Sequence, residues 1–264
     1  MIPYIGGKSY LANWIIQNFP NDYEKKTYVE VFGGGGWVLF KKPESYLEVY
    51  NDLNSQLSNL FRIIRDNYEE FAHRSEWSLH SREMYIEARE KLKDDKFLSD
   101  VEKAMHYAVN KCQSFSGKGG WAYAVTTDKM YSGKWLPFLK RMQLINARLK
   151  KVQIECLSFE QLIPKYDSPN TLFYVDPPYV DVESYYDTAE VKFRRAEHEA
   201  LAKLLKKIKG RFVLSYYEHP VVRELYSDFR IITKNSVKHS AGATRARGKG
   251  VVKPKSIELL IMNY

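Results

Sequence analysis

One nine-residue stretch, from Thr171 to Tyr179, constrains the fold of this chain more than any other. Residues 172–175 read Leu-Phe-Tyr-Val, and such a run of strand formers without a polar face is typical of a central parallel strand covered on both sides. Pro177 and Pro178 then end the strand, because proline lacks an amide hydrogen and has a restricted φ angle. The stretch predicts an α/β fold with a rigid corner after a buried strand.

The corner has the chemical groups needed to hold a planar base that carries an amino group. The Asp176 carboxylate and the Pro177 carbonyl can each accept one amino hydrogen, and Tyr179 offers an aromatic face for stacking. Accepting both hydrogens localises the lone pair on the nitrogen and makes the nitrogen nucleophilic. An ordinary turn after a strand is the alternative interpretation, so the function depends on partners elsewhere in the chain.

A second strand leads into a turn with the features of a nucleoside site. Residues 27–32 predict a strand, residues 33–36 are four glycines, and a helical segment follows. Glycines let the backbone approach a ligand closely. Asp52 ends the next predicted strand, 19 residues after Gly33, which is close to the spacing of about 20 at which an acid binds ribose hydroxyls. A plain tight turn and a helix N-cap are the alternatives, but order and spacing together favour nucleoside binding.

The N-terminal residues place amides and a cation before a short amphipathic helix. Gly6, Gly7 and Lys8 precede that helix, and a helix N-terminus with a cation favours a carboxylate or a phosphate. The Gly-Lys-Ser sequence is not a P-loop, because the first glycine of that motif would fall at Ile2 and no strand precedes it.

The middle of the chain, residues 56–151, differs in character, because apolar residues at helical spacing predict four helices there. Their predicted inner faces are Leu57, Leu60, Phe61 and Ile64; Tyr85, Ala88 and Leu92; Val101, Met105, Ala108 and Val109; and Leu136, Leu139, Met142, Ile145 and Leu149. Within them, residues 113–125 are rich in glycine, aromatic and small polar residues, which suits an exposed loop whose side chains reach bases. A surface loop with aromatics anchored in the core is the alternative. Residues 180–192 suit either a lid over the corner or a solvated connection. Residues 235–254 are basic and suit either phosphate contact or a solvated loop.

Composition limits the classes of protein that fit. Lys and Arg total 41 against 32 Asp and Glu, a net charge of +9 that favours polyanionic partners. No apolar run is long enough to span a bilayer, and no signal peptide opens the chain. Cys112 and Cys156 lack metal-site spacing and are expected to be reduced and largely buried, as in a cytoplasmic protein. The six histidines form no ligand pair, so no metal site is predicted.

Five blocks of this sequence occur in the order of one known family. They are Pro3-Tyr-Ile-Gly-Gly-Lys8, Val29-Glu-Val-Phe-Gly-Gly-Gly-Gly36, Asn51-Asp52, Asp176-Pro-Pro-Tyr179 and Glu258-Leu-Leu-Ile-Met-Asn263. Together they resemble the Dam-like DNA adenine-N6 methyltransferases over nearly the whole chain. The resemblance implies a Rossmann-like methyltransferase sheet with a mainly helical DNA-recognition insert. Residues 1–55 and 152–264 would form the catalytic domain, and residues 56–151 the insert.

The resemblance also implies a cofactor, a substrate and a set of site residues. S-adenosylmethionine would be the methyl donor, and an adenine flipped out of double-stranded DNA the acceptor. Asp176, Pro177 and Tyr179 would hold the target base. The donor pocket would be lined by Tyr4, Gly7, Lys8, Phe32, Gly33, Gly34, Gly35, Asp52, Ser158, Phe159 and Asp176. Family members commonly have an acidic residue where this chain has Ser158.

The predicted DNA contacts lie in the insert and in the basic loop. They are Ser114, Phe115, Ser116, Lys118, Trp121, Tyr123 and Lys134, together with Lys238, Arg245, Arg247 and Lys249. We further expect a cytoplasmic monomer without a membrane partner, and a cognate restriction enzyme is a candidate partner. Two alternative functions share the same corner: a cytosine-N4 DNA methyltransferase, and a DNA-binding relative that has lost catalysis.

Overall fold

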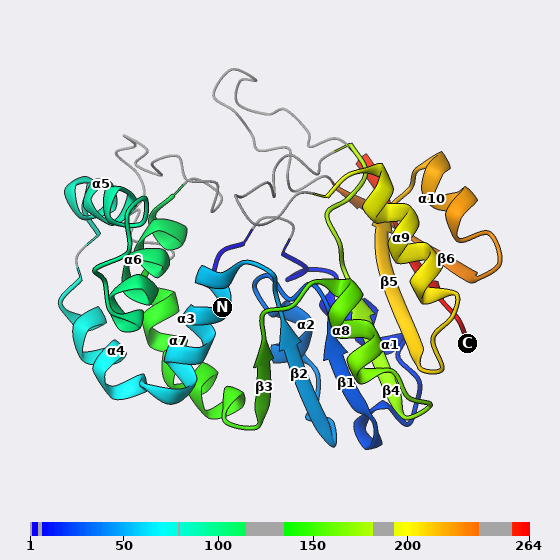
Figure 1. The fold of residues 1–264 in the computed structure, drawn as a ribbon, viewed down its shortest axis with the longest axis horizontal. Coiled ribbons are helices and arrows are strands. Elements are labelled where there is room, and N and C mark those ends of the chain that lie inside the picture. Colours follow the sequence, from blue (N-terminus) through cyan, green and yellow to red (C-terminus); the bar gives the residue numbers. More distant parts are fainter. Residues whose placement is uncertain (1, 5–6, 79, 115–134, 182–192, 238–254) are drawn as a thin grey trace.

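The structure is a computed structural model that describes residues 2–4, 7–78, 80–114, 135–181, 193–237 and 255–264. Its centre is a seven-stranded sheet in the order β3-β2-β1-β4-β5-β7-β6 (Figure 1). The strands are β1 (Thr27–Glu30), β2 (Leu47–Asn51), β3 (Val152–Glu155), β4 (Thr171–Val175), β5 (Arg211–Tyr217), β6 (Arg230–Val237) and β7 (Lys255–Met262).

The strand that the sequence singled out, β4, lies in the middle of this sheet. It pairs in parallel with β1 on one side and with β5 on the other, and all five of its residues are buried. β2 and β3 extend the parallel part, whereas β7 runs antiparallel to both β5 and β6. The prediction of a mostly parallel, Rossmann-like sheet is confirmed.

Helices cover both faces of the sheet, as a parallel sheet requires. On one face lie α8 (Phe159–Tyr166), α9 (Arg195–Leu205) and α10 (Pro220–Leu225), whose apolar residues pack on alternate residues of the strands. On the other face lie α1 (Ala12–Gln17) and α2 (Trp37–Lys41), with a short 3-10 turn at Tyr23–Lys25. The carboxyl ends of the parallel strands therefore open between two helical layers.

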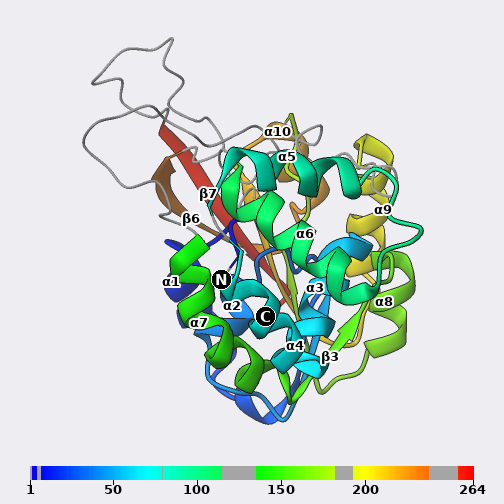
Figure 2. The same cartoon turned by 90° about the vertical axis from the view of Figure 1, so that its left-hand side faces the viewer.

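A group of helices stands beyond the β3 edge of the sheet (Figures 1 and 2). It consists of α3 (Ser55–Asp66), α4 (Tyr68–Glu76), α5 (Arg82–Lys91), α6 (Asp100–Gln113) and α7 (Trp135–Leu149). We call these five helices the helical group. Asn146 of α7 donates to the Ile64 carbonyl oxygen of α3 at 2.7 Å, and the Trp135 indole donates to the Ser78 carbonyl oxygen at 2.8 Å. No helix in the described part of the chain has the length and apolar composition to cross a membrane.

Three details of this region differ from the sequence predictions. α4 was not among the predicted helices, because Phe71 is its only buried large apolar side chain and the apolar period is weak. Leu136 was assigned to the inner face of its helix but is 49% exposed, whereas Trp135 and Phe138 are buried instead. Cys156 was expected to be buried but is exposed, because it follows the end of the edge strand β3.

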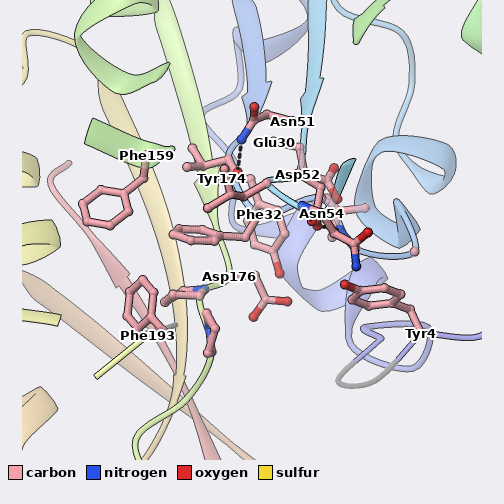
Figure 3. A pocket seen from close by; sticks show the side chains of 18 of the residues that line it. Tyr4, Glu30, Phe32, Asn51, Asp52, Asn54, Phe159, Tyr174, Asp176 and Phe193 are labelled. Carbon is pink, nitrogen blue, oxygen red and sulfur yellow. Dashed lines mark hydrogen bonds between the residues drawn. The ribbon is translucent and has the colours of Figure 1, made fainter. Parts of the chain in front are cut away.

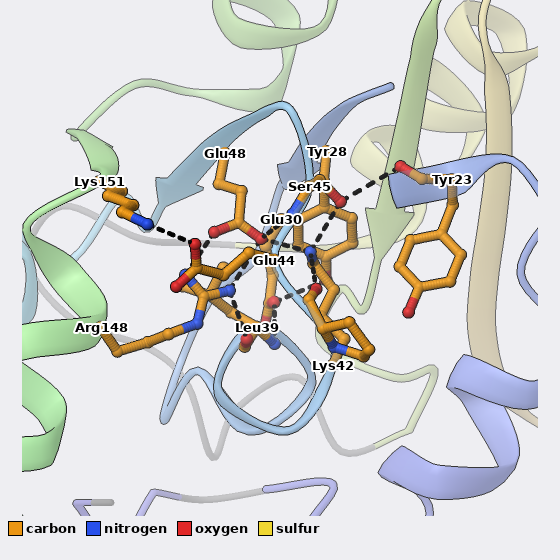
Figure 4. Close-up of polar contacts among 11 residues, drawn as sticks. Tyr23, Tyr28, Glu30, Leu39, Lys42, Glu44, Ser45, Glu48, Arg148 and Lys151 are labelled. Carbon is orange, nitrogen blue, oxygen red and sulfur yellow. Dashed lines mark hydrogen bonds and ion pairs between the residues drawn. The ribbon is translucent and has the colours of Figure 1, made fainter. Parts of the chain in front are cut away.

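A buried charge cluster joins the helical group to the sheet (Figure 4). Glu48 on β2 forms ion pairs with Lys42, just after α2, and with Arg148 of α7. Arg148 also donates to the Leu39 carbonyl oxygen at 3.1 Å, and Lys42 donates to the Ser45 hydroxyl at 2.8 Å. Burial raises the pKa of Glu48, but hydrogen bonds from Arg148 and the Lys42 charge outweigh burial and lower it overall. Glu48 is therefore held ionised by two cations.

Candidate active site

A cavity of about 270 Å³ opens at the carboxyl ends of β1, β2 and β4 (Figure 3). Three turns form its walls: the glycine turn after β1, the Asn51–Asn54 turn after β2, and the Asp-Pro-Pro turn after β4. The start of α8 and the N-terminal residues complete it. Ligands of α/β proteins bind at this edge of the sheet, where strand order reverses.

Every residue that the sequence assigned to the donor pocket lines this one cavity. They are Tyr4, Gly7, Lys8, Phe32, Gly33, Gly34, Gly35, Asp52, Ser158, Phe159 and Asp176. Pro177, which was assigned to the base, lines it as well, whereas Tyr179 does not. Residues from distant parts of the sequence thus meet around one space large enough to be a binding site.

The glycine turn lines the cavity on one side and packs against the Tyr50 side chain on the other. A Cβ atom on Gly33 would lie 2.1 Å from the Tyr50 ring, so any side chain here would displace that ring. Gly34 has a φ of +50°, in the left-handed region that favours glycine. The Tyr50 hydroxyl donates to the Gly34 carbonyl oxygen at 2.7 Å. The glycines were predicted to let a ligand approach the backbone closely, and in the structure they also let the Tyr50 side chain approach it closely.

Asp52 closes the opposite side of this turn. One carboxylate oxygen accepts the Gly34 amide at 2.8 Å, and the other accepts the Asn54 amide at 2.9 Å. Burial raises the pKa of Asp52, and these two hydrogen bonds and the charge of Lys111 on α6 oppose that rise. A carboxylate oxygen accepts more than one hydrogen bond, so Asp52 keeps acceptor capacity toward the cavity.

Three aromatic rings form the far wall. The ring centroids of Phe32, Phe159 and Phe193 lie 5.8 to 6.0 Å from one another, and Figure 3 shows them across the cavity from Asp52 and Tyr4. Such a wall suits one face of a planar heterocycle. Phe193 was not predicted from the sequence, because it lies in a polar stretch and no motif marks it.

Ser158 stands beside this wall, at the N-cap of α8. Its amide donates to the Gln161 side-chain oxygen at 3.4 Å. The neighbouring Glu160 is exposed and also lines the cavity. This chain therefore places a carboxylate two residues beyond the position where family members commonly have one.

Asp176 lies where β4 ends, and its partner is Lys8. The Lys8 ammonium is 2.8 Å from one Asp176 carboxylate oxygen, and the two side chains are 8% and 16% exposed. Burial raises the pKa of Asp176, while the Lys8 charge opposes the rise. The anion that the sequence led us to expect near Lys8 is thus a side chain of the same protein in this structure.

Tyr179 is 5% exposed and does not line the cavity itself, but it lies beside the cavity residues Lys8 and Asp176. Its hydroxyl donates to Glu258 on β7 at 2.5 Å, and its ring packs edge-to-face on Tyr217 with centroids 4.6 Å apart. The Lys8 ammonium lies 4.6 Å from the centroid of the same ring. Stacking of a base on Tyr179 stays a prediction, and it requires the Lys8 ammonium to leave the ring face.

Glu30 is a buried carboxyl group of the cavity that sequence reasoning missed. It accepts the Tyr28 hydroxyl at 2.7 Å and the Leu39 amide at 2.8 Å. Burial raises its pKa to about 8, against the effect of these two hydrogen bonds. Glu30 therefore holds a proton at neutral pH. Its position inside an apolar strand was the available signal.

A pH-dependent stability follows from this raised pKa. The unfolded chain releases the Glu30 proton near pH 4.5, whereas the folded protein keeps it to about pH 8, so stability is lost between these values. The loss is at most about 5 kcal/mol. Glu30→Gln does not titrate, and we expect it to lose less stability than the parent between pH 5 and 8 in urea unfolding. Exposed Glu160→Gln is the control, and equal losses in Glu30→Gln and the parent would contradict the assignment.

Of the residues predicted to contact DNA, the structure describes only Ser114. Ser114 is fully buried at the end of α6, with its hydroxyl 3.4 Å from the Lys111 carbonyl oxygen, and a DNA contact by Ser114 stays a prediction. The remaining residues lie outside the part of the chain that the structure describes: Phe115, Ser116, Lys118, Trp121, Tyr123, Lys134, Lys238, Arg245, Arg247 and Lys249. The described residues contain no group of acids, histidines and cysteines that could hold a metal ion.

Comparisons with known proteins agree with this geometry. A family model for D12 class N6 adenine-specific DNA methyltransferases matches residues 4–239. Type II methyltransferase M1.LlaDCHI of Lactococcus lactis subsp. cremoris is 28% identical and aligns over 99% of this chain and 94% of its own. M.MjaIII of Methanocaldococcus jannaschii is 24% identical, and the alignment covers 100% of this chain and 98% of M.MjaIII. M.CviBI of Paramecium bursaria Chlorella virus NC1A is 23% identical, and the alignment covers 87% of this chain and 86% of M.CviBI.

The family match confirms the resemblance seen in the sequence, including the predicted DNA substrate and the predicted donor. It decides between adenine and cytosine as the base that this class methylates, because its description specifies N6 of adenine. The chain belongs to the D12 class of N6 adenine-specific DNA methyltransferases, which transfer a methyl group from S-adenosylmethionine to adenine in DNA.

Proposed function

We propose that the target adenine is methylated at the Asp176 corner, with the donor held in the cavity between the glycine turn, Asp52 and the aromatic wall. The observation that carries this proposal is the convergence of three separate turns, after β1, β2 and β4, on one cavity. In a donor site of this kind, the methyl group must face the acceptor nitrogen in line, and Asp176 stands at the boundary between the two.

The residues of the cavity fit the parts of S-adenosylmethionine. Asp52 has acceptor capacity for ribose hydroxyls, and Phe32, Phe159 and Phe193 offer a wall for the adenine ring. Asp176 supplies a carboxylate near the place that a positive sulfonium would take, and the protonated Glu30 carboxyl group lines the same cavity. When bound, the donor supplies an activated methyl group, and the chain supplies orientation and a site screened from water.

The base would be held by the corner after β4. The Asp176 carboxylate and the Pro177 carbonyl each accept one hydrogen of the adenine amino group, which concentrates its lone pair toward the cavity. The Asp176 charge also stabilises positive charge that develops on the nitrogen. The extra proton on that nitrogen then passes to Asp176 or to water. Flipping the adenine out of the duplex costs a few kcal/mol, and contacts from the helical group would offset that cost.

We propose that residues 56–151 recognise DNA and that residues 1–55 and 152–264 carry catalysis. The helical group supports this division, because its helices pack on one another beside the β3 edge (Figure 2). Asp52 and Lys111, which belong to the two parts, interact electrostatically at the cavity. The basic residues at 238–249 would add phosphate contacts from the other side of the site.

The partners follow from the reaction and the relatives. Relatives that carry the name Type II methyltransferase support a cognate restriction enzyme that acts on the same site. A monomer is sufficient, because one chain contains the whole cavity and the acceptor corner. We place the enzyme in the cytoplasm, where it would meet both DNA and the donor.

Asp52→Ala tests the donor site. We expect it to weaken S-adenosylmethionine binding about 10- to 100-fold, because hydrogen bonds to a charged group contribute about 1.5 to 3 kcal/mol. Equilibrium dialysis with labelled donor measures this, with Asp228→Ala as the control, since Asp228 is exposed and pairs with Lys206. Unchanged affinity in Asp52→Ala would remove Asp52 from the donor site.

The proposed function as a whole is tested by methyl transfer from tritium-labelled donor to mixed-sequence duplex DNA. Label is expected in the DNA, and the methylated sites then give the target sequence. A protein that binds the donor and DNA but incorporates no label would contradict the proposal and would favour the catalytically inactive alternative.

A further inference from the structure

Lys8 occupies the place that the proposed function gives to the adenine. Its ammonium is 2.8 Å from the Asp176 carboxylate and 4.6 Å from the centroid of the Tyr179 ring. These are the acceptor and the ring face assigned to the base. An ammonium group and a purine cannot fill the same space, so entry of the base requires Lys8 to move.

Glu258 is the group that can receive it. This β7 residue is 1% exposed, and its first carboxylate oxygen accepts the Tyr179 hydroxyl. Its second oxygen is buried and makes no hydrogen bond with any residue in the described part of the chain. Glu258 already interacts with the Lys8 charge. A buried polar atom without a partner is costly, and a Lys8 ammonium that moved here would satisfy it.

We propose that Lys8 is a placeholder for the flipped adenine, and that Glu258 is the positioning residue that receives its ammonium when the base enters. This inference rests on the proposed placement of the adenine at Asp176 and Tyr179. Before base entry, Lys8 compensates the charge of Asp176. Afterward, Lys8 pairs with Glu258, Asp176 accepts the amino group, and Tyr179 keeps its bond to Glu258 while its ring face is cleared.

The exchange depends on the ionisation of Glu258. Burial raises the pKa of Glu258 to about 7, against the Lys8 charge and the Tyr179 hydrogen bond. Below this pH, the carboxyl group is neutral and holds a displaced ammonium less strongly. The described groups that face it from neighbouring elements are Lys8, Tyr10, Tyr174, Asp176, Tyr179, Tyr217 and Lys234. The rate of base entry should therefore rise between pH 6 and 8.

Glu258→Gln tests the inference with little change of shape. The glutamine side chain can still accept the Tyr179 hydroxyl but has no charge for Lys8. We expect the single-turnover rate of methyl transfer to fall about 10- to 100-fold, as for the loss of a hydrogen bond to a charged group. Donor affinity should stay within about twofold of the parent, and the rise between pH 6 and 8 should be lost. Glu224→Gln on α10 is the matched control, because Glu224 is exposed.

The Lys8→Met background identifies the route of the effect. If Glu258 acts by receiving Lys8, adding Glu258→Gln to Lys8→Met should change the rate less than about twofold, because partners in one network are not additive. An equal loss in both backgrounds would overturn the inference. A Glu258→Gln rate and pH profile like those of the parent would overturn it as well.

A crystal structure decides the matter where a variant fails to fold or is inactive. The parent protein would be crystallised with S-adenosylhomocysteine and duplex DNA that contains the mapped target site. We expect the Lys8 nitrogen about 3 Å from the second Glu258 oxygen, within hydrogen-bond range. Lys8 still paired with Asp176 beside a bound adenine would overturn the inference alone, whereas an adenine bound elsewhere would overturn the proposed function.

Discussion

Replacing Asp176 by alanine is expected to lower the rate of methyl transfer about 1,000-fold, the upper end of the range for loss of one preorganised electrostatic group in an active site. The substitution removes an acceptor for the amino hydrogens and the negative charge beside the reacting nitrogen. Donor binding should change little, because the ribose and adenine contacts proposed for Asp52 and the aromatic wall remain. The loss should therefore appear in the transfer step.

Single-turnover assays with saturating donor measure the rate, and equilibrium dialysis measures donor binding. Asp176→Asn is the matched variant, because it keeps the size and one acceptor oxygen but loses the charge that faces Lys8. Its rate should lie between those of the parent and the alanine variant. An alanine variant that transfers methyl groups at the parent rate would remove Asp176 from the reaction.

Replacing Glu48 by leucine is expected to destabilise the protein by about 3 to 5 kcal/mol, as for other buried ion pairs that lose one partner. The side chains of Glu48 and Lys42 are 2% and 0% exposed, so the variant leaves the Lys42 ammonium buried without its carboxylate. Arg148 also loses its pairing with Glu48, although it keeps the Leu39 carbonyl oxygen. Urea unfolding measures the change in the free energy of unfolding.

The double variant Lys42→Met with Glu48→Leu is the control for this prediction. It removes both charges of the innermost pair, and apolar replacement of a whole buried pair is often neutral or stabilising. We therefore expect it to recover most of the stability lost in Glu48→Leu. A single variant within about 1 kcal/mol of the parent would show that the cluster is not held as described.

Local pattern was enough to predict the central strand and the turns after β1, β2 and β4, whereas Tyr4, Ser158 and Phe159 came from the family resemblance. β4 reads as a buried strand because all five of its residues face a covered layer. The four glycines and Asp52 have a fixed order and spacing along the chain, and parallel strands bring their carboxyl ends together. Each of these features depends on neighbours in sequence or on a general rule of topology, so a single sequence contains it.

Other parts of the site depend on contacts between distant residues. Phe193 joins the aromatic wall only because the chain returns there before α9, and Glu258 meets Lys8 across nearly the whole length of the chain. The sequence predicted that Lys8 has an anionic partner, but it did not predict that this partner is Asp176. In α7, the predicted inner positions Met142, Ile145 and Leu149 are buried, but the first turn was misassigned, because Trp135 is buried there and Leu136 is exposed.

The central claim is that a base amino group is methylated at the Asp176 corner. Its most direct test is mass spectrometry of nucleosides from DNA incubated with the donor and either the parent protein or Asp176→Ala. We predict N6-methyldeoxyadenosine with the parent and none above background with the variant. N4-methyldeoxycytidine as the product, or equal N6-methyldeoxyadenosine from both proteins, would contradict the account.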